Sequence, residues 1–264
     1  MSDPVIVRPT WYETFEIGSF WTDVNGRASP HALLQMMQDV AWKHARALKF
    51  GYSDLGARNR FWVLSRLIMD VSRYPRWGET VRLESWTSGT DKLLALRDFR
   101  LYDDDERELM KSVSGWLIVD HESRRPLRPE GIVKELSIPS LPSQYDGGPE
   151  KVRTPEPDDG TQTTYSVAAR YSDIDAQKHV NNTRYVSWMI DGLSEDWVVN
   201  RRIRRMSVNF LKECNLGDTL QIAHTYPPEQ DQTRHSVLRE SDGQYAAHMH
   251  LHWDTGNTTV FTQS

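Results

Sequence analysis

The sequence has a single cysteine, Cys214, among its 264 residues. One thiol excludes an internal disulfide framework and a cysteine-based zinc cluster, and it is consistent with a reducing compartment. The sequence also lacks an excess of basic residues, because the formal net charge is −5 and the pI is about 6.0. This balance gives no electrostatic indication of a nucleic-acid partner.

Long apolar runs are missing as well. No segment approaches the roughly 18 apolar residues that a membrane-spanning helix needs. The N-terminal segment, MSDPVIVRPT, contains neither the apolar core of a signal peptide nor an Arg- and Ser-rich amphipathic stretch. We therefore expect a soluble, cytoplasmic protein. Hydrophobic residues make up 38% of the chain, which is enough for a folded core in one large domain or two small ones.

Hydrophobic patterning divides the chain into two halves with the same order of elements. In the first half, Ser29 followed by proline is typical of a helix start, an apolar stripe of helical period runs over 33–48, and Gly51 is expected to end the helix. Strands are predicted at 11–17, 61–71, 80–87, 93–102 and 109–119. One helix followed by an antiparallel meander indicates an α+β fold rather than a doubly wound sheet.

A linker separates the halves at residues 122–162, where seven prolines and several glycines gather. The second half has a helical stripe over 185–197, and strands are predicted at 164–171, 206–210, 219–226, 235–240 and 245–253. We therefore predict an N-terminal domain at 1–121 and a C-terminal domain at 163–264. The two copies indicate two antiparallel sheets joined edge to edge, each wrapped around its helix.

Two short matches align the copies, residues 21–25 with 171–175 and residues 77–81 with 216–220. The alignment gives three pairs of positions: Asn25 with Asp175, Ser29 with His179, and Tyr74 with Glu213. The first half then lacks all three ionisable groups. This predicts that the chemistry belongs to the second half and that the first half serves substrate binding.

Polar groups are concentrated at 171–188, YSDIDAQKHVNNTRYVSW, just before the second helical stripe. Unpaired backbone N–H groups and the helix dipole favour negative charge at such a place. Two carboxylates and a histidine, Asp175, Glu213 and His179, suit hydrolysis in which one group accepts a proton from water or attacks directly. The backbone N–H groups near Val180 and Asn181 are candidate donors to an oxyanion.

Each of these residues also has a simpler interpretation. His179 fits a helix-cap histidine bonded to the backbone, and Glu213 fits an ion-pair partner of Lys178 or Lys212. His248, His250 and His252 alternate on one strand and would suit zinc, but a solvated or helix-facing strand surface explains them better. We expect no metal.

With these residues the chain resembles the acyl-ACP thioesterases of plant plastids and bacteria. The resemblance rests on FEIG (15–18), the helix from Ser29, SRYPRWGETV (72–81), SDIDAQKHVNNTRYVSWMID (172–191) and NFLKECNLGDTL (209–220). It covers nearly the whole chain and implies a tandem double hotdog fold. It also implies an enzyme that hydrolyses acyl-ACP to free fatty acid and holo-ACP in fatty acid biosynthesis, without a cofactor. Because no plastid transit peptide is evident, the resemblance favours a bacterial source.

Carried over residue by residue, the resemblance assigns catalytic roles to Asp175, His179 and Glu213. It places at Cys214 a cysteine once proposed as a nucleophile. The family's catalytic asparagine, two residues after the aspartate, is replaced here by Gln177, which keeps the amide and adds a methylene. Gln177 therefore stays a catalytic candidate that orients a carboxylate or a water molecule. This departure argues against a Cys-His-Asn arrangement of the papain type and favours hydrolysis led by a carboxylate.

The resemblance places the acyl chain between the helix and the sheet of the first half. The candidates for its lining, which also fit ordinary core positions, are Met36, Met37, Val40, Trp62, Leu64 and Trp116. A basic run is a candidate dock for an acidic acyl carrier protein, or else a solvated helix end. The run consists of Arg201, Arg202, Arg204 and Arg205.

Other functions and assemblies remain open at the level of the sequence. The alternatives are an acyl-CoA thioesterase on the same fold, a hotdog hydratase or dehydratase, and a non-catalytic acyl-binding protein. The duplicated fold is compatible with a monomer or a homodimer, and neither a nucleic acid nor a membrane is an expected partner.

Overall fold

The computed structural model describes residues 8–135, 137–156, 160–227 and 231–254, so the predicted domains extend beyond the described residues at both ends. The first half contains β1 (Thr10–Glu16), η1 (Ser19–Trp21), α1 (Pro30–Ala47), α2 (Tyr52–Gly56), β2 (Arg60–Val71), β3 (Thr80–Asp91), β4 (Leu94–Asp103) and β5 (Glu108–Asp120). The connection contains β6 (Pro126–Leu127) and α3 (Pro129–Glu135). The second half contains β7 (Thr161–Ala168), η3 (Tyr171–Asp173), α4 (Asn182–Asp191), α5 (Glu195–Asn200), β8 (Arg202–Phe210), β9 (Thr219–Tyr226), β10 (Gln232–Arg239) and β11 (Gln244–Asp254).

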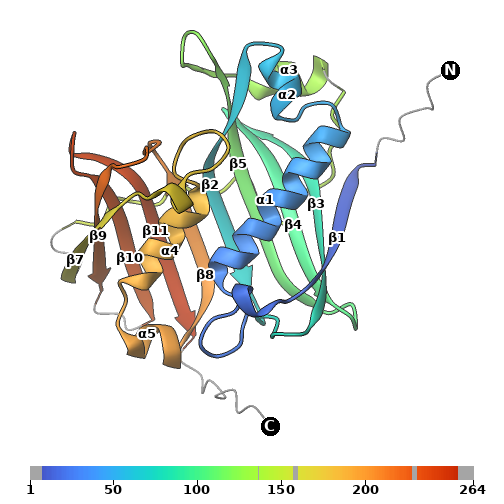
Figure 1. Cartoon of the computed structure of the whole chain (residues 1–264). Coiled ribbons are helices and arrows are strands. Elements are labelled where there is room, and N and C mark those ends of the chain that lie inside the picture. Colours follow the sequence, from blue (N-terminus) through green and yellow to red (C-terminus); the bar gives the residue numbers. More distant parts are fainter. Residues whose placement is uncertain (1–7, 136, 157–159, 228–230, 255–264) are drawn as a thin grey trace.

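The described strands form one antiparallel sheet in the order β1-β3-β4-β5-β2-β8-β11-β10-β9-β7, with β6 paired to β5. The two half sheets meet where β2 pairs with β8, which places Met69 opposite Met206. Figure 1 shows α1 in front of the first half sheet and α4 in front of the second. The prediction of an α+β tandem double hotdog, with two antiparallel sheets joined edge to edge, is confirmed. Among the described helices, none is long and apolar enough to cross a membrane.

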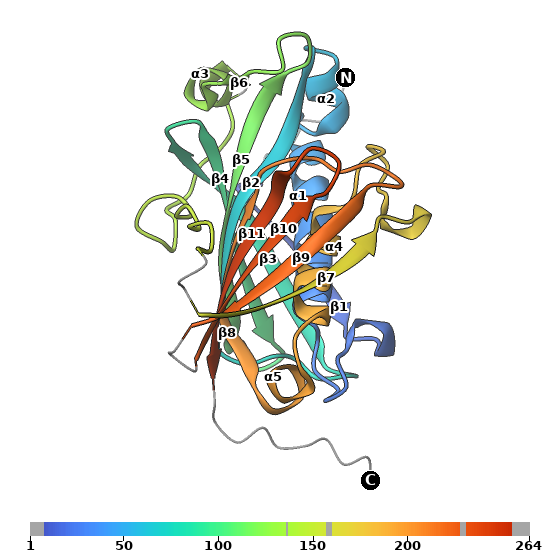
Figure 2. The same ribbon diagram turned by 90° about the vertical axis from the view of Figure 1, so that its left-hand side faces the viewer.

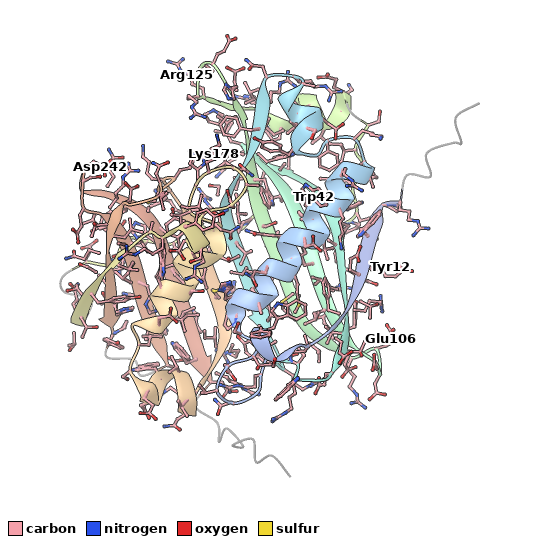
Figure 3. The ribbon with its side chains drawn as sticks, in the orientation of Figure 1. Tyr12, Trp42, Glu106, Arg125, Lys178 and Asp242 are labelled. Atoms are coloured by element: carbon pink, nitrogen blue, oxygen red, sulfur yellow. The ribbon has the colours of Figure 1, made fainter. Side chains whose placement is uncertain are left out.

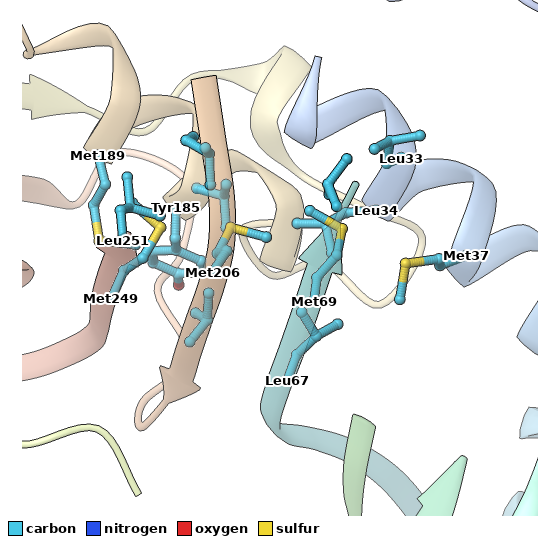
Figure 4. Close-up of a cluster of buried hydrophobic side chains, with 14 of the residues drawn as sticks. Leu33, Leu34, Met37, Leu67, Met69, Tyr185, Met189, Met206, Met249 and Leu251 are labelled. Atoms are coloured by element: carbon cyan, nitrogen blue, oxygen red, sulfur yellow. The ribbon is translucent and has the colours of Figure 1, made fainter. Parts of the chain in front are cut away.

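One hydrophobic core runs across the junction between the halves. Met69, Met206 and Met249 have no exposed surface, and Leu34 of α1 is almost completely buried. Figure 4 shows Met69 on β2 and Met206 on β8 beside each other, with side chains of α1 on one side and of β11 on the other. Since burying such a side chain contributes about 1.5–3 kcal/mol, this shared core makes the two halves one structural unit.

The start of α1 follows the prediction, but its end does not. Ser29 Oγ accepts the N–H of Ala32 at 3.1 Å, which caps the helix as expected. The helix ends at Ala47 and does not continue to Gly51. Gly51 instead precedes α2, where its N–H donates to Asp54 Oδ2 at 3.0 Å. The predicted end was wrong because a glycine between two helices can begin the second as well as end the first.

The second helix is broken where one stripe was predicted over 185–197. α4 has 10 residues and stops before Gly192, and α5 follows as a separate short helix. A Cβ atom on Gly192 would lie 2.2 Å from His224 Nε2, so the chain passes too close to the sheet for any side chain there. α4 also contacts α1, through a hydrogen bond between Ser187 Oγ and His31 Nδ1.

The connection between the halves is attached to the sheet rather than free. It runs over the face opposite to α1 and α4, as Figure 2 shows. Gln144 N–H donates to Asp98 Oδ1 at 2.8 Å, and the Tyr145 hydroxyl donates to Asp70 Oδ2 at 2.8 Å. The predicted linker 122–162 therefore contains ordered structure, and β7 begins inside its range.

Matching backbone hydrogen bonds show how the two copies align. Asp23 N–H donates to the Arg27 carbonyl at 2.7 Å, and Asp175 N–H donates to the His179 carbonyl at 2.9 Å. The β-bridges next to these turns, between residues 22 and 28 and between residues 174 and 180, also match. Asp23 is therefore the counterpart of Asp175, and Arg27 is the counterpart of His179.

This alignment corrects the one predicted from the sequence. The predicted counterparts, Asn25 and Ser29, lie two positions too far along the chain. The error arose because a loop before a helix has no periodic pattern that fixes its register. The pairing of Tyr74 with Glu213 holds, since the residue after each makes the same backbone bond to the turn in its own half. The first half thus does carry ionisable groups at two of the three positions.

Candidate active site

A cavity of about 810 Å³ lies between α1 and the first half sheet and reaches the loop before α4. Most of its wall consists of apolar and aromatic side chains from α1, β2, β4 and β5. Residues from 175–182 and 211–213 of the second half surround one end of the cavity. We call this end the mouth, because Gln177 and Glu213 are exposed to solvent there. Its size and its mixture of an apolar wall with few polar groups are typical of a small-molecule site.

The mouth loop is held in a tight turn by Asp175. Its N–H donates to the His179 carbonyl at 2.9 Å, and its Oδ1 accepts the N–H of Gln177 at 2.8 Å. Lys178 adopts the left-handed conformation that the turn requires, with φ of 69°. Figure 3 shows Lys178 on this loop, in front of the sheet between the two halves. The turn therefore fixes the position of His179 relative to the Asp175 carboxylate.

A backbone hydrogen bond joins the mouth loop to the connection between β8 and β9. Val180 N–H donates to the Cys214 carbonyl at 2.8 Å. As a result the preceding residues also meet, and His179 Nε2 lies 3.5 Å from Glu213 Oε2. Arg239 Nη1 donates to the Glu213 carbonyl at 2.8 Å and holds that residue from β10. The structure thus brings together a histidine and a carboxylate that are distant in the sequence.

The two halves differ in the second oxygen of the turn aspartate. Asp23 Oδ1 accepts the N–H of Asn25 at 2.8 Å, and Asp23 Oδ2 accepts a hydrogen bond from Arg27 Nε at 2.9 Å. Asp175 makes the same bond with Oδ1, but its Oδ2 has no partner among the residues that the structure describes. The second half therefore leaves one carboxylate oxygen at the mouth for water or substrate.

The first-half copy of the site is closed by contacts with the second half. Asn25 Nδ2 donates to the Val199 carbonyl at 3.0 Å, at the end of α5. The hydroxyl of Tyr74, the counterpart of Glu213, donates to the Ile203 carbonyl at 2.9 Å. Because both side chains are buried in these contacts, this copy ties the halves together and has no access to a substrate.

Cys214 does not reach the cavity. It has no exposed surface and does not belong to the cavity lining. Burial raises the pKa of its thiol, so the nucleophilic thiolate is disfavoured. Its backbone N–H donates to the Tyr185 hydroxyl at 3.1 Å. These contacts are those of a core residue and give Cys214 no route to a thioester.

The two backbone N–H groups predicted as oxyanion donors are already bonded. Val180 N–H donates to the Cys214 carbonyl at 2.8 Å, and Asn181 N–H donates to the Asp173 carbonyl at 2.9 Å. Both residues line the mouth, as predicted, but neither N–H points to an open position. The sequence prediction is corrected here, because the turn before α4 uses these donors to hold itself together.

Half of the predicted acyl-site residues line the cavity. The residues that line it are Trp62, Leu64 and Trp116. Met37 lines only a small adjoining cavity, while Met36 and Val40 are buried and line neither. Helical periodicity identifies the buried face of α1, but it does not show which part of that face meets the sheet and which part meets open space.

Several polar lining residues were not predicted, among them Arg97 and Gln38. Arg97 on β4 is 5% exposed, and its Nη1 donates to His44 Nδ1 and Ser85 Oγ, both at 3.0 Å. Burial without a carboxylate partner in these contacts lowers the pKa of Arg97 to about 10. Gln38 on α1 lines the cavity where α1 passes α4. The sequence did carry a signal for both residues. Arg97 is a polar residue at an inward position of a strand, and Gln38 is a polar residue at an inward position of a helix.

The predicted carrier dock does not lie at the mouth. The run consists of Arg201 at the end of α5 and of Arg202, Arg204 and Arg205 on β8. Figure 1 shows α5 and the start of β8 at the opposite end of the second half from the mouth loop. At about 3.3 Å per residue, β8 separates Arg202 from Phe210 by roughly 26 Å. Arg201 stacks on Trp197 at 3.9 Å, and Arg202 pairs with Asp254.

Two of the three alternating histidines of β11 bond to polar neighbours, and His252 packs against the ring of His250 at 4.5 Å between centroids. His248 Nε2 lies 3.1 Å from Thr154 Oγ1, and His250 Nε2 lies 3.0 Å from Gln232 Oε1. Burial lowers the pKa of His248 and of His250 to about 4. Within the described part of the chain, no group of three His, Cys, Asp or Glu side chains is placed to hold a metal ion.

Comparison with known proteins relates the chain to one family. The chain matches the family model for the acyl-ACP thioesterase N-terminal domain at residues 9–136 and that for the C-terminal domain at residues 156–255. A chloroplastic acyl-[acyl-carrier-protein] hydrolase of Cuphea viscosissima is 24% identical over 258 residues, which cover 92% of this chain and 61% of the relative. The chain therefore spans about three fifths of the length of that relative.

Two solved structures share the fold. An acyl-ACP thioesterase from Bacteroides thetaiotaomicron superposes with a TM-score of 0.81 and 23% identity, covering 93% of this chain and 98% of that one. A 12:0-ACP thioesterase from Umbellularia californica gives a TM-score of 0.83 and 22% identity, with 94% and 98% coverage. Since the two family models together match most of the sequence, the chain belongs to the acyl-ACP thioesterase family.

Proposed function

We propose that this protein hydrolyses the thioester of an acyl chain bound to acyl carrier protein, releasing a free fatty acid and the carrier thiol in fatty acid biosynthesis. The observation that carries the proposal is the position of Asp175, His179 and Glu213 at the mouth of a long apolar cavity. Membership of the family, and the carrier-bound substrates in the names of its relatives, support the choice of substrate.

The acyl chain lies in the cavity beside Trp62, Leu64 and Trp116, with its thioester at the mouth. Each buried methylene contributes about 0.8 kcal/mol to binding, so the apolar wall supplies most of the affinity. The volume of about 810 Å³ limits the length of the chain that fits. The carrier stays outside the mouth, because only the acyl chain and the end of its prosthetic arm can enter.

In the proposed reaction Glu213 is the general base. His179, whose Nε2 lies 3.5 Å from Glu213 Oε2, orients the Glu213 carboxylate, which accepts a proton from a water molecule. The water oxygen then attacks the thioester carbon, and Asp175 Oδ2 accepts a hydrogen bond from the O–H that the water keeps, which directs the attack. When the carbon–sulfur bond breaks, protonated Glu213 returns its proton to the departing thiolate. The mechanism uses no cofactor.

Release of thiol from a panel of acyl-ACP and acyl-CoA substrates of different chain lengths tests the proposal. We expect a higher kcat/KM for acyl-ACP, with a preference for chains of limited length. Faster release from acyl-CoA would make the protein an acyl-CoA thioesterase. Acyl binding without thiol release would make it a binding protein, and hydration of an enoyl thioester would make it a lyase.

We further propose a bacterial, cytoplasmic location, for which the single, buried thiol of Cys214 gives compositional support. The protein acts as a monomer or a homodimer in this proposal, because the duplicated chain already joins two half sheets. Cell fractionation and light scattering of the purified chain test these two points.

A further inference from the structure

Gln38 places an amide at the wall of an otherwise apolar helix face. The residues of α1 that line the cavity are Gln38, Ala41, Trp42 and Ala45. Of these, Gln38 alone carries a side-chain carbonyl or amide. It also lines the small adjoining cavity, together with Asn182 from the start of α4. Gln38 therefore lies at the junction of the two halves, where its side chain contacts Asn181 of the mouth loop.

The orientation of this amide is set by the cap of α4. Asn181 Oδ1 accepts the N–H of Thr183 at 2.9 Å and the Thr183 hydroxyl at 2.8 Å. Because an acceptor of backbone N–H must be the oxygen, the other atom of the Asn181 carboxamide is its nitrogen. Asn181 Nδ2 then donates to Gln38 Oε1 at 3.4 Å. This bond is long, but its direction follows from the chemistry of the two amides. The Asn181 nitrogen can only donate, so the atom of Gln38 that faces it must be the oxygen Oε1.

The same reasoning fixes the second atom of the Gln38 amide. With Oε1 turned to Asn181, Nε2 carries two hydrogens away from α4. Nε2 donates to no residue in the described part of the chain, yet it does not belong to the buried, unpartnered polar atoms there. It is therefore an open donor in the cavity wall. An amide donor held by a fixed partner suits the stabilisation of a negative charge that develops during a reaction.

The two backbone N–H groups predicted as oxyanion donors at the mouth are not free to act in the proposed hydrolysis. The N–H groups of Val180 and Asn181 are bonded to carbonyl groups. Attack of water on the thioester carbon moves the electron pair of the C=O bond onto its oxygen, and that oxygen needs a hydrogen bond. We propose that Gln38 Nε2 donates this hydrogen bond, so that Gln38 is a catalytic residue contributed by the first half. This inference rests on the proposed thioester hydrolysis.

Gln38→Met tests the assignment, because methionine keeps the length of the side chain and removes both donors. Gln35→Met on the exposed side of α1 is the matched control. Loss of one oxyanion donor costs about 10²–10³-fold in kcat. We expect a loss of that size in kcat for Gln38→Met together with a small rise in the KM for acyl-ACP, and wild-type kinetics for Gln35→Met.

A binding measurement separates this role from a structural one. Acyl-ACP analogues with an amide in place of the thioester keep the carbonyl oxygen, whereas thioether analogues lack it. We expect Gln38→Met to weaken binding of the amide analogue and to leave binding of the thioether analogue unchanged. A general disturbance of the cavity would weaken both and overturn the assignment.

The outcomes also distinguish this inference from the proposed function. If the wild-type protein releases thiol and Gln38→Met does so at the same rate, the role of Gln38 is overturned and the function stands. If the wild-type protein itself releases no thiol from any acyl-ACP, the proposed function fails and the oxyanion role fails with it.

Discussion

Asp175 and Asp23 make the same turn in the two halves of the chain, but only Asp175 keeps a carboxylate oxygen without a partner among the residues that the structure describes. Each aspartate accepts the N–H of the residue two positions later, at 2.8 Å in both cases. Arg27 neutralises the second oxygen of Asp23, whereas His179 turns instead toward Glu213. The aspartate of this duplicated turn thus has a structural role in the first half, and the aspartate of the second half is left available for chemistry.

This pair provides a matched test of the catalytic role of Asp175. Asp175→Asn keeps the Oδ1 acceptor and therefore the turn, but it removes the negative charge from the free atom. We expect kcat to fall at least about 10²-fold, within the range of lost acid–base catalysis. Asp23→Asn makes the identical chemical change in the closed copy and should leave kcat near the wild-type value.

Steady-state thiol release from acyl-ACP measures both variants, and thermal unfolding confirms that each is folded. Equal losses of activity in the two variants would show that the turn matters only for structure. An unchanged kcat in Asp175→Asn would remove the carboxylate from the mechanism.

The role of Glu213 as a base, rather than a nucleophile, is open to isotope labelling. In a single turnover in ¹⁸O-water, a general base leaves all the label in the fatty acid. A nucleophilic carboxylate would form a mixed anhydride, and attack of labelled water on the glutamyl carbon of that anhydride would place label in the protein. We expect no label in the peptide that contains Glu213 or in the peptide that contains Asp175, as measured by mass spectrometry.

Cys214→Ala is expected to leave kcat near the wild-type value. The thiol has no exposed surface, and burial raises its pKa, so it is neither accessible nor ionised for attack. Loss of its packing against Tyr185 should lower the free energy of unfolding by about 1 kcal/mol. Activity measured together with denaturant unfolding checks both parts, and loss of activity in a stably folded variant would restore a nucleophilic cysteine.

The sequence predicts the fold well because its signals are periodic. Alternation and helical stripes locate the strands and α1, and the Ser29 cap is where it was expected. The local signals failed at Gly51 and Gly192. At Gly51 the sequence does not say which helix a glycine serves, and at Gly192 the break depends on the distant side chain of His224.

The candidate site was predicted in its members but not in its contacts. Asp175, His179 and Glu213 do meet at one mouth, yet the loop register of the first copy was two residues off. The occupation of the Val180 N–H by the Cys214 carbonyl depends on two segments that only the fold brings together. Donors and open space are properties of the assembled structure, so the pattern could show Gln38 as a polar residue on an inward face but not that it borders the cavity.

Gly192→Ala should destabilise the protein strongly. The added Cβ would lie 2.2 Å from His224 Nε2 and 2.3 Å from Tyr165 Cε1, and both rings are packed inside the second half. Because Gly192 has φ of −84°, the backbone tolerates alanine and the effect is purely steric. We expect a loss of about 3 kcal/mol in the free energy of unfolding.

Gly18→Ala is the control for this substitution, because a Cβ there meets no atom within 4 Å. Its φ of −78° is equally permissive. Denaturant unfolding of both variants gives the comparison. A loss below about 1 kcal/mol for Gly192→Ala would mean that the ring pair moves aside easily.

Buried histidines should make the protein less stable as the pH falls. Burial, with the nearby Arg97 as a second cause, lowers the pKa of His44 to about 4, and burial lowers the pKa of His224 to about 4. His224 Nδ1 and His235 Nδ1 lie 2.8 Å apart and share one hydrogen, so a second proton would place two donors against each other. The folded state therefore keeps these rings neutral.

The direction of the pH dependence follows from proton binding. In the unfolded chain the histidines titrate near pH 6.5, so below that pH the unfolded state binds more protons than the folded state. Stability is fully present above pH 6.5 and is lost as the pH falls toward 4. Urea unfolding between pH 7.5 and 4.5 measures this loss. His121→Gln, at an exposed position, should leave the profile unchanged, and a flat wild-type profile would contradict the prediction.

Carrier docking is best tested by reversing charge at two separate places. Arg202→Glu with Arg204→Glu changes the predicted dock at the start of β8, and Lys178→Glu changes the mouth loop. Exposed charges act over about 10 Å at moderate ionic strength, so a response identifies the surface that the carrier covers. Because the dock lies roughly 26 Å along β8 from the mouth, we expect Lys178→Glu to raise the KM for acyl-ACP more strongly.

Acyl-CoA serves as the control substrate, since it presents a thioester without a protein carrier. A rise of KM for acyl-ACP that exceeds the rise for acyl-CoA reports on carrier contacts, whereas equal rises report on the charge of the mouth itself. If the double arginine variant alone raises the KM for acyl-ACP, the carrier binds at the start of β8 as the sequence predicted. The carrier must then reach around the second half to deliver its thioester to His179 and Glu213, a path that the present geometry makes long.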